Sequence, residues 1–144
     1  MKDYFNDTFY IRERTKTTNI ATQLAQKVKI GDIIALYGTL GAGKTAFCRG
    51  FIQSLIPEKE VPSPTFTLLQ TYDTPLYPVY HFDMYRLKSP EEAYEIGIED
   101  AFSEGVSLIE WPEKMGNILP KKHISVTLET KGTERIITIE GIEL

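Results

Sequence analysis

One stretch of the sequence decides the fold: Ile33-Ile34-Ala35-Leu36-Tyr37-Gly38-Thr39-Leu40-Gly41-Ala42-Gly43-Lys44-Thr45. Its first half, from Asp32 to Tyr37, is a nearly continuous apolar run, the pattern of a strand that is buried on both faces. After the glycines, apolar residues from Ala46 to Leu55 recur at helical spacing and stop before Pro57. Strand, loop and helix follow in the order of a phosphate-binding loop, and the pattern Gly, four residues, Gly-Lys-Thr is matched in full.

The residue types of this loop predict its chemistry. Glycines let the backbone curl so that successive N–H groups converge on phosphate oxygens, and the positive end of the following helix adds to the attraction. Lys44 is predicted to bridge the β- and γ-phosphates of a nucleotide, and the Thr45 hydroxyl to bind Mg²⁺. The predicted nucleotide contacts in the loop are Gly38, Leu40, Gly41, Ala42, Gly43, Lys44 and Thr45.

A metal at Thr45 also needs a carboxylate from a neighbouring strand, and two are available. Glu110 ends the apolar run that begins at Val106, and Asp83 ends the less apolar run from Val79. Open α/β sheets bind ligands at the carboxyl ends of their strands, so we predict Glu110 as the second metal residue. Asp83 is predicted to orient the attacking water or accept its proton. Together with Lys44 these acids form the predicted catalytic set, and the alternative for either acid is a helix cap or a solvated strand end.

Regular patterns continue on both sides of the loop. The helices expected span residues 17–28 and 46–55, with a further one that begins at Ser89-Pro90. The strands expected besides 32–37 span residues 65–72, 79–85, 106–109, 124–128 and 137–139, the first two and the last two as antiparallel pairs. We therefore predict a single domain over residues 1–144 of the α/β class. It is a three-layer P-loop NTPase fold in which a mixed parallel/antiparallel sheet has about six or seven strands.

Composition excludes several classes of function. The chain has 144 residues, of which 20 are acidic and 16 are basic. Its net charge of −4 argues against nucleic-acid binding through a broad basic surface. Any RNA contact is therefore expected through partners or a local patch. Cys48 is the single cysteine, which leaves no internal disulfide and no cysteine-based zinc site. No run approaches the roughly 18 apolar residues of a spanning helix, so a cytoplasmic protein without a membrane segment is expected.

Four motifs, in one order and spacing, resemble those of the bacterial TsaE family. They are Gly38 to Thr45, Ser63-Pro64-Thr65-Phe66, His81-Phe82-Asp83-Met84-Tyr85-Arg86 and Leu108-Ile109-Glu110-Trp111-Pro112. The resemblance implies a Mg²⁺-dependent ATPase, weakly active alone, in the synthesis of N6-threonylcarbamoyladenosine at position 37 of tRNA. It also implies TsaB and TsaD proteins as partners. In that family TsaD carries the threonylcarbamoyl transfer, so the resemblance implies that ATP hydrolysis resets the assembly and that tRNA is contacted through the complex.

The resemblance adds further residues to the candidate site. It matches Ser63 and Thr65 to a mobile loop near the γ-phosphate, Trp111 to the aromatic residue after the metal-linked acid, and Thr17 to a position near the nucleotide base. Lys44, Thr45, Glu110 and Asp83, which are already assigned to phosphate, metal and turnover, also match positions of the family's functional residues. One departure is Thr39, which stands where the family usually has an acid and leaves the role of that side chain open.

Two other functions use the same residues. A small P-loop kinase would pass the γ-phosphoryl group to a metabolite, but it needs an acceptor pocket and usually an arginine-bearing lid. The side chain of Arg86 is expected either to reach a phosphate group, as such a lid arginine would, or to donate a hydrogen bond at the end of the sheet. A non-catalytic module would use bound ATP only to set its affinity for a partner. Free phosphate as the product indicates an ATPase, a phosphorylated acceptor a kinase, and unchanged ATP a nucleotide sensor.

Overall fold

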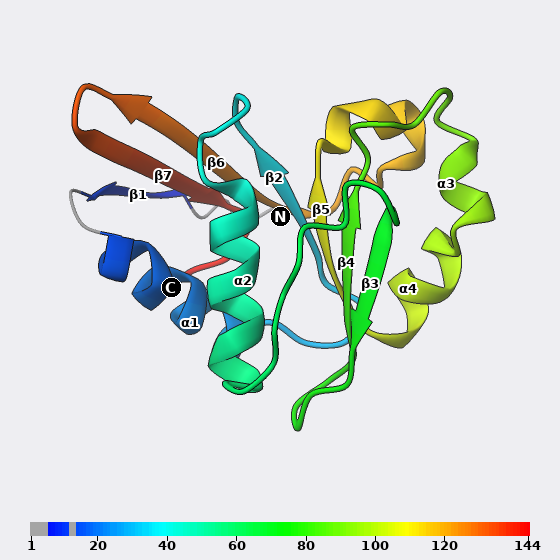
Figure 1. The fold of residues 1–144 in the computed structure, drawn as a ribbon, viewed down its shortest axis with the longest axis horizontal. Helices are drawn as coiled ribbons and strands as arrows, with labels where there is room; N and C mark the ends of the chain where they lie inside the picture. Colours follow the sequence, from blue (N-terminus) through cyan, green and yellow to red (C-terminus); the bar gives the residue numbers. More distant parts are fainter. Residues whose placement is uncertain (1–5, 12–13) are drawn as a thin grey trace, which may run out of the picture.

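A computed structural model describes residues 6–11 and 14–144 of the chain. Seven strands form one sheet in the order β1-β7-β6-β2-β5-β4-β3 (Figure 1). They are β1 (Asn6–Ile11), β2 (Ile33–Tyr37), β3 (Leu69–Tyr72), β4 (Val79–Asp83), β5 (Val106–Glu110), β6 (Ile124–Lys131) and β7 (Glu134–Glu140). Strands β6, β2, β5 and β4 run parallel to one another, and the remaining pairs are antiparallel. The predicted mixed sheet is therefore confirmed.

Helices cover both faces of the sheet, which gives three layers. The helices are α1 (Arg14–Lys27), α2 (Lys44–Leu55), α3 (Glu92–Glu95), α4 (Ile98–Glu104) and the 3₁₀ helix η1 (Pro112–Ile118). One core lies under α1 and α2 and includes Leu24 and Phe51, whereas the other lies under α3, α4 and η1 and includes Met115. Leu108 of β5 belongs to the first core and its neighbour Ile109 to the second, because side chains alternate along a strand. The predicted three-layer α/β fold is confirmed.

The central strands set the position of the candidate site. Residues 33–36 of β2 and all of β5 are buried, as expected for parallel strands covered on both faces. Leu36 is the register partner of Glu110, and Asp83 of β4 is also paired with Glu110. The carboxyl ends of β2, β5 and β4 therefore meet at one edge, directly beside the loop that leads from β2 into α2.

Two predicted boundaries were wrong for identifiable reasons. The strand expected from residue 65 begins at Leu69, because the Thr65 hydroxyl bonds Asp83 and the Leu68 N–H bonds the Pro64 carbonyl. Leu68 has a positive φ of 67°, which ends the extended geometry there. The helix expected from Ser89 is divided into α3 and α4 at Gly97, whose φ is 86°.

Strand β1 was not predicted. It pairs with β7 in antiparallel register, so the terminal β6–β7 hairpin, which is confirmed, lies inside the sheet and not at its edge. Its sequence, NDTFYI, begins with three polar residues and is too short for a clear alternation.

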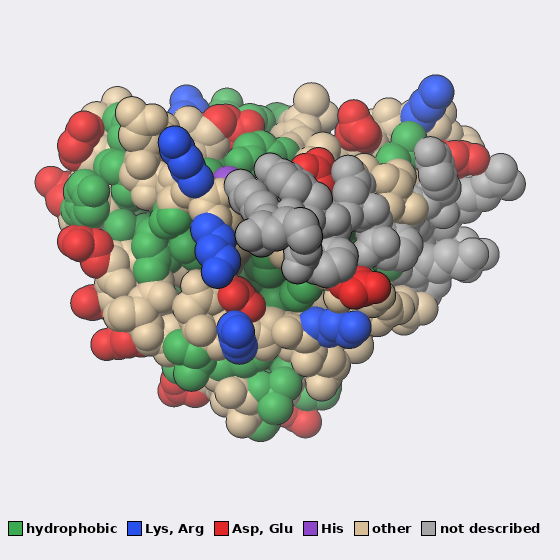
Figure 2. All heavy atoms as spheres, turned by 180° about the vertical axis from the view of Figure 1, so that it is seen from behind, with side chains coloured by type: hydrophobic (Ala, Val, Ile, Leu, Met, Phe, Trp, Pro, Cys, Tyr) green, Lys and Arg blue, Asp and Glu red, His purple; other side chains and the backbone are tan. Residues whose placement is uncertain are grey.

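Charge is unevenly distributed over the surface. The view in Figure 2 shows acidic side chains along the side that carries α3 and α4, where Glu95, Glu99 and Asp100 are exposed. Lys and Arg side chains lie nearer the middle of the same view. None of the helices in the described ranges is long and apolar enough to cross a membrane.

Candidate functional site

The phosphate loop is shaped by glycines at two crowded points. Gly43 is the residue before α2 and has a φ of 103°, a left-handed conformation that disfavours any side chain. A Cβ atom added at Gly38 would lie 2.7 Å from the carbonyl oxygen of Leu128, so neighbouring backbone excludes a side chain there. The loop closes with a hydrogen bond from the Ala42 N–H to the Thr39 carbonyl, 3.0 Å long.

Lys44 is held inside the site and not in solvent. Its Nζ donates to the Gly38 carbonyl at 2.6 Å and lies 3.3 Å from the ring centroid of Trp111, a cation–π contact. Burial lowers the pKa of Lys44, while the carboxylates of Glu113, Glu110 and, more weakly, Asp83 oppose that shift. A negatively charged ligand would compensate this desolvated ammonium group.

Glu110 links the loop to the centre of the sheet. One carboxylate oxygen, Oε1, accepts a hydrogen bond from Thr45 Oγ1 at 2.8 Å, and the other, Oε2, lies 2.7 Å from His81 Nε2. Glu110 and His81 are both buried, so each carboxylate oxygen has a partner where water is excluded. Sequence reasoning assigned both Thr45 and Glu110 to a metal, and the structure places their side-chain oxygens next to each other.

Asp83 organises the segment after Pro62. Its Oδ2 accepts a hydrogen bond from Thr65 Oγ1 at 2.9 Å, and Thr65 lies 2.7 Å from Ser63 Oγ. The other oxygen, Oδ1, accepts from the Tyr85 N–H at 3.0 Å. Asp83 therefore contacts the Ser63–Thr65 loop, whereas Glu110 contacts Thr45, and the two acids occupy different positions in the site.

These groups surround one cavity of about 330 Å³. Its lining contains most of the predicted residues: Leu40, Gly41, Gly43, Lys44, Thr45, Ser63, Thr65, Asp83, Glu110 and Trp111. Ala42 is buried beneath the loop, and Gly38 lines the neighbouring hollow. Thr17 is buried on α1 with no hydrogen-bond partner found for its hydroxyl, and it lines neither of these spaces, so its contact with a base stays a prediction.

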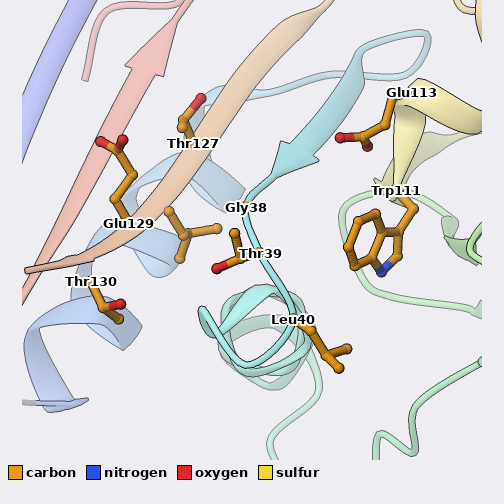
Figure 3. Close-up of a pocket in the computed structure, with 9 residues that line it drawn as sticks. Gly38, Thr39, Leu40, Trp111, Glu113, Thr127, Glu129 and Thr130 are labelled. Carbon is orange, nitrogen blue, oxygen red and sulfur yellow. The ribbon is translucent and has the colours of Figure 1, made fainter.

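A second hollow of about 600 Å³ adjoins the loop. Figure 3 shows Gly38, Thr39 and Leu40 between the strand that carries Thr127 and Glu129 and the segment that carries Trp111 and Glu113. Leu40 and Trp111 line both spaces and so form the boundary between them. Trp111 adopts a left-handed conformation with φ 56°, and the ring of Tyr85 packs against it at a tilt of 55°, with 5.0 Å between the ring centroids.

Cys48 lies one helical turn after Lys44 and is fully buried. Burial raises the pKa of its thiol well above the ordinary value, and the charges of Glu110 and Asp83 act in the same direction. Its sulfur lies within 4.8 Å of ligand atoms of His81 and Glu110. Cys48 therefore packs as a small buried hydrophobic residue.

Sequence reasoning missed one cation of the cavity. Arg135, the second residue of β7, lines it beside Gly43. No local motif marks this residue, because strand pairing brings it to the loop from a hairpin about 90 positions later. Arg86, the arginine that the sequence singled out, instead lies over the ring of Phe66, 5.0 Å from its centroid.

Comparison with known proteins gives consistent matches. The family model described as "Threonylcarbamoyl adenosine biosynthesis protein TsaE" matches residues 11–137. The tRNA threonylcarbamoyladenosine biosynthesis protein TsaE of Rickettsia bellii is 46% identical over 125 residues, 86% of this chain and 87% of that protein. The Bacillus subtilis protein of the same name is 36% identical over 129 residues, with 88% and 80% covered. The crystal structure of Bacillus subtilis YdiB matches with a TM-score of 0.82 and 29% identity, covering 99% of this chain and 90% of that one.

Proposed function

Since the chain belongs to the TsaE family, we propose that it is a Mg²⁺-dependent ATPase that supports the synthesis of N6-threonylcarbamoyladenosine at position 37 of tRNA. The observation that carries the proposal is one cavity lined by the phosphate loop, the Thr45–Glu110 pair and Asp83. These are the parts that phosphoryl transfer needs: a cradle for phosphate, a metal site, and a polar group to orient the nucleophile.

The loop and Lys44 supply the phosphate cradle. The first backbone N–H groups of α2 lie at the N-terminal end of the helix, beside the cavity. The helix dipole favours an anion at this end. Lys44 now uses its ammonium group on the Gly38 carbonyl and the Trp111 ring, two neutral partners. A phosphate group is a better partner, because a charge-assisted hydrogen bond is about twice as strong as a neutral one.

Thr45 and Glu110 fit a Mg²⁺ ion. Their oxygens lie 2.8 Å apart at the cavity wall, and hydroxyl and carboxylate oxygens are the hard ligands that this cation takes. When bound there, Mg²⁺ neutralises charge on the phosphate oxygens. His81 fixes the orientation of Glu110 from behind through its 2.7 Å contact with Oε2.

Asp83 acts on the side of the γ-phosphate from which the water molecule attacks. Both of its oxygens already accept hydrogen bonds, so its first effect is to hold Thr65, and with it Ser63, at the cavity. Such an arrangement suits the orientation of a water molecule in line with the leaving phosphate. Asp83 is therefore expected to contribute more to the transition state than to ATP binding.

Partner proteins complete the proposed activity. TsaB and TsaD are the expected partners, and tRNA is contacted through that complex, as the net charge of −4 favours. Leu40, at the cavity mouth, is 81% exposed, and Phe66, next to Thr65, is 84% exposed. Burial of these two apolar side chains against a partner would bring that partner to the reacting end of the site. A role in tRNA modification also fits the cytoplasmic location expected from the sequence.

Phosphate release tests the proposal. The purified chain should release phosphate from ATP slowly with Mg²⁺ and faster when TsaB and TsaD are added, and the Lys44→Ala variant should release none. A phosphorylated metabolite in place of free phosphate would indicate the kinase alternative. ATP that is bound and recovered unchanged in the complete mixture would indicate the nucleotide sensor.

A further inference from the structure

A hollow of about 490 Å³ lies at the end of the sheet opposite to the phosphate loop. Its lining includes Ile33 and Ile124, the first residues of the parallel strands β2 and β6, so it opens at the amino ends of these strands. Figure 1 shows the turn that enters β2 at one end of this strand and the loop that leads to α2 at the other. The length of β2 places these two ends roughly 13 Å apart. A ligand in the hollow is therefore separate from the nucleotide cavity.

Lysines from three segments line this hollow. Lys27 ends α1, Lys29 lies in the turn before β2, and Lys122 lies just before β6. All three residues are exposed, and no ion pair to any of them is present in residues 6–11 and 14–144. Because they come from different segments, their charges are distributed over the wall of the hollow and do not follow one helix face. The hollow therefore offers three cations that no carboxylate neutralises.

The other ionisable groups of the wall are already engaged. Asp32 is the one acid among the described residues that line the hollow, and its Oδ2 accepts a hydrogen bond from the Lys29 N–H at 3.0 Å. His123 Nδ1 donates to the Pro120 carbonyl at 2.7 Å, and His123 Nε2 lies 3.4 Å from the Tyr37 hydroxyl. The lysines are therefore the groups of this wall that can meet an anion.

The backbone of the wall is fixed by its neighbours. Gly141 follows β7 with a φ of 99°, and a Cβ atom added there would lie 3.0 Å from the His123 carbonyl oxygen. The chain after β7 thus passes directly beside the segment that enters β6. In the turn before β2, the Gly31 N–H donates to the Gly105 carbonyl at 2.9 Å, which ties this turn to the end of α4. Segments held in this way lose less entropy when their side chains engage a ligand.

We propose that this hollow, with Lys27, Lys29 and Lys122, binds the sugar–phosphate backbone of RNA. The assignment rests on the proposed function, which makes tRNA the polyanion that the chain meets, and it adds a direct contact to the one made through partner proteins. Several separated cations suit the repeated charges of an RNA backbone. Three such contacts give weak binding that depends on salt and not on base sequence. The net charge of −4 argues against a broad basic surface but agrees with a local one.

Fluorescence anisotropy with a labelled, unmodified tRNA transcript tests the assignment. The hollow variant carries Lys27→Gln, Lys29→Gln and Lys122→Gln. A matched control removes three exposed lysines outside the hollow and changes the net charge equally: Lys59→Gln, Lys88→Gln and Lys131→Gln. The wild-type and control proteins should lose about 20- to 40-fold in affinity between about 50 and 200 mM KCl, as three phosphate contacts predict. The hollow variant should bind about tenfold or more weakly at the lower salt concentration and lose most of this salt dependence.

A second variant covers the case in which the hollow variant does not fold, which melting temperatures report. Lys27 is a cation in the last turn of α1, where the helix dipole favours it. The double variant Lys29→Gln with Lys122→Gln leaves Lys27 in place and should lose about two thirds of the salt dependence.

Three results overturn the proposal. They are the absence of salt-dependent RNA binding by the wild type, equal RNA affinities of the hollow and control variants, and displacement of the RNA by polyglutamate as effectively as by unlabelled tRNA of equal charge. The last result would assign the hollow to an acidic protein segment. Phosphate release from ATP without RNA should be unchanged in both variants, because the hollow is separate from the nucleotide cavity. If the wild-type chain releases no phosphate from ATP, the proposed function itself fails, which is a separate result.

Discussion

Replacement of Asp83 by asparagine should separate ATP turnover from ATP binding. The carboxylate accepts one hydrogen bond from Thr65 and one from the Tyr85 N–H, and it is 4% exposed. Asparagine keeps the size and one acceptor oxygen, so one of these bonds survives in neutral form. Hydrogen bonds to charged groups contribute roughly 1.5–3 kcal/mol, and we expect the variant to lose about 1–2 kcal/mol of folding stability.

That loss of stability is measurable and moderate. At roughly 3–4 °C per kcal/mol for a chain of this size, the melting temperature should fall by about 3–8 °C, which leaves the protein folded at 25 °C. The turnover number should fall by about 100-fold, the scale of a lost positioning or proton-accepting group. ATP affinity should stay within about threefold of the wild type, because Lys44 and Thr45 are untouched.

Both quantities can be measured on one preparation. Trp111 is the single tryptophan and contacts Lys44, so its fluorescence reports nucleotide binding directly. Phosphate release gives turnover. A matched variant, Thr65→Val, removes the hydroxyl that Asp83 holds and leaves the acid in place. If Asp83 works through Thr65, the double variant should be no slower than Asp83→Asn alone.

Two results would refute this reasoning. Wild-type turnover in Asp83→Asn would reduce Asp83 to a structural strand end. Lost ATP affinity together with a lost Mg²⁺ response would mean that Asp83, and not Glu110, serves the metal.

The remaining predictions concern three neighbouring residues, Lys44, Glu110 and Cys48. Lys44→Ala should fold and lose tight ATP binding, since it removes a charge-assisted contact of roughly 1.5–3 kcal/mol, and wild-type affinity by calorimetry would contradict the cradle. Glu110→Ala should weaken the dependence of ATP affinity on Mg²⁺, whereas a lower melting temperature with an intact metal response would indicate a purely structural acid. Because burial raises the pKa of Cys48, the thiol ionises in the unfolded chain before it does in the folded one. The free energy of unfolding should therefore be unaffected by the thiol below about pH 8.5 and should fall above it. Melting curves of Cys48→Ala should show a weaker dependence on pH. In the folded protein Cys48 should also resist alkylation at pH 8, and rapid labelling without unfolding would contradict its burial.

The parts of the site that could be predicted from sequence are those with local patterns. The loop from Gly38 to Thr45 needs only the glycines, the lysine and the flanking apolar runs to be recognised. Glu110 and Asp83 could be predicted because both follow apolar strands, and parallel strands place such residues at a common edge.

Features that depend on contacts distant in sequence could not be predicted. The start of β3 is set by Thr65 bonding Asp83, 18 positions away, and no propensity at residues 65–68 signals it. Arg135 reaches Gly43 only because β7 folds back beside β6. The contact between His81 and Glu110 could not be predicted either, since it follows from the register of β4 with β5.

The strand order also has a consequence for the timing of assembly during synthesis. In the described part of the chain the first strand, β1, has one neighbour, and that neighbour is β7, the last strand. A chain emerging from the ribosome can form the β2–α2 unit early, but β1 has no place to pair until nearly all the sequence is available. A nascent chain would therefore complete its sheet only at that late moment.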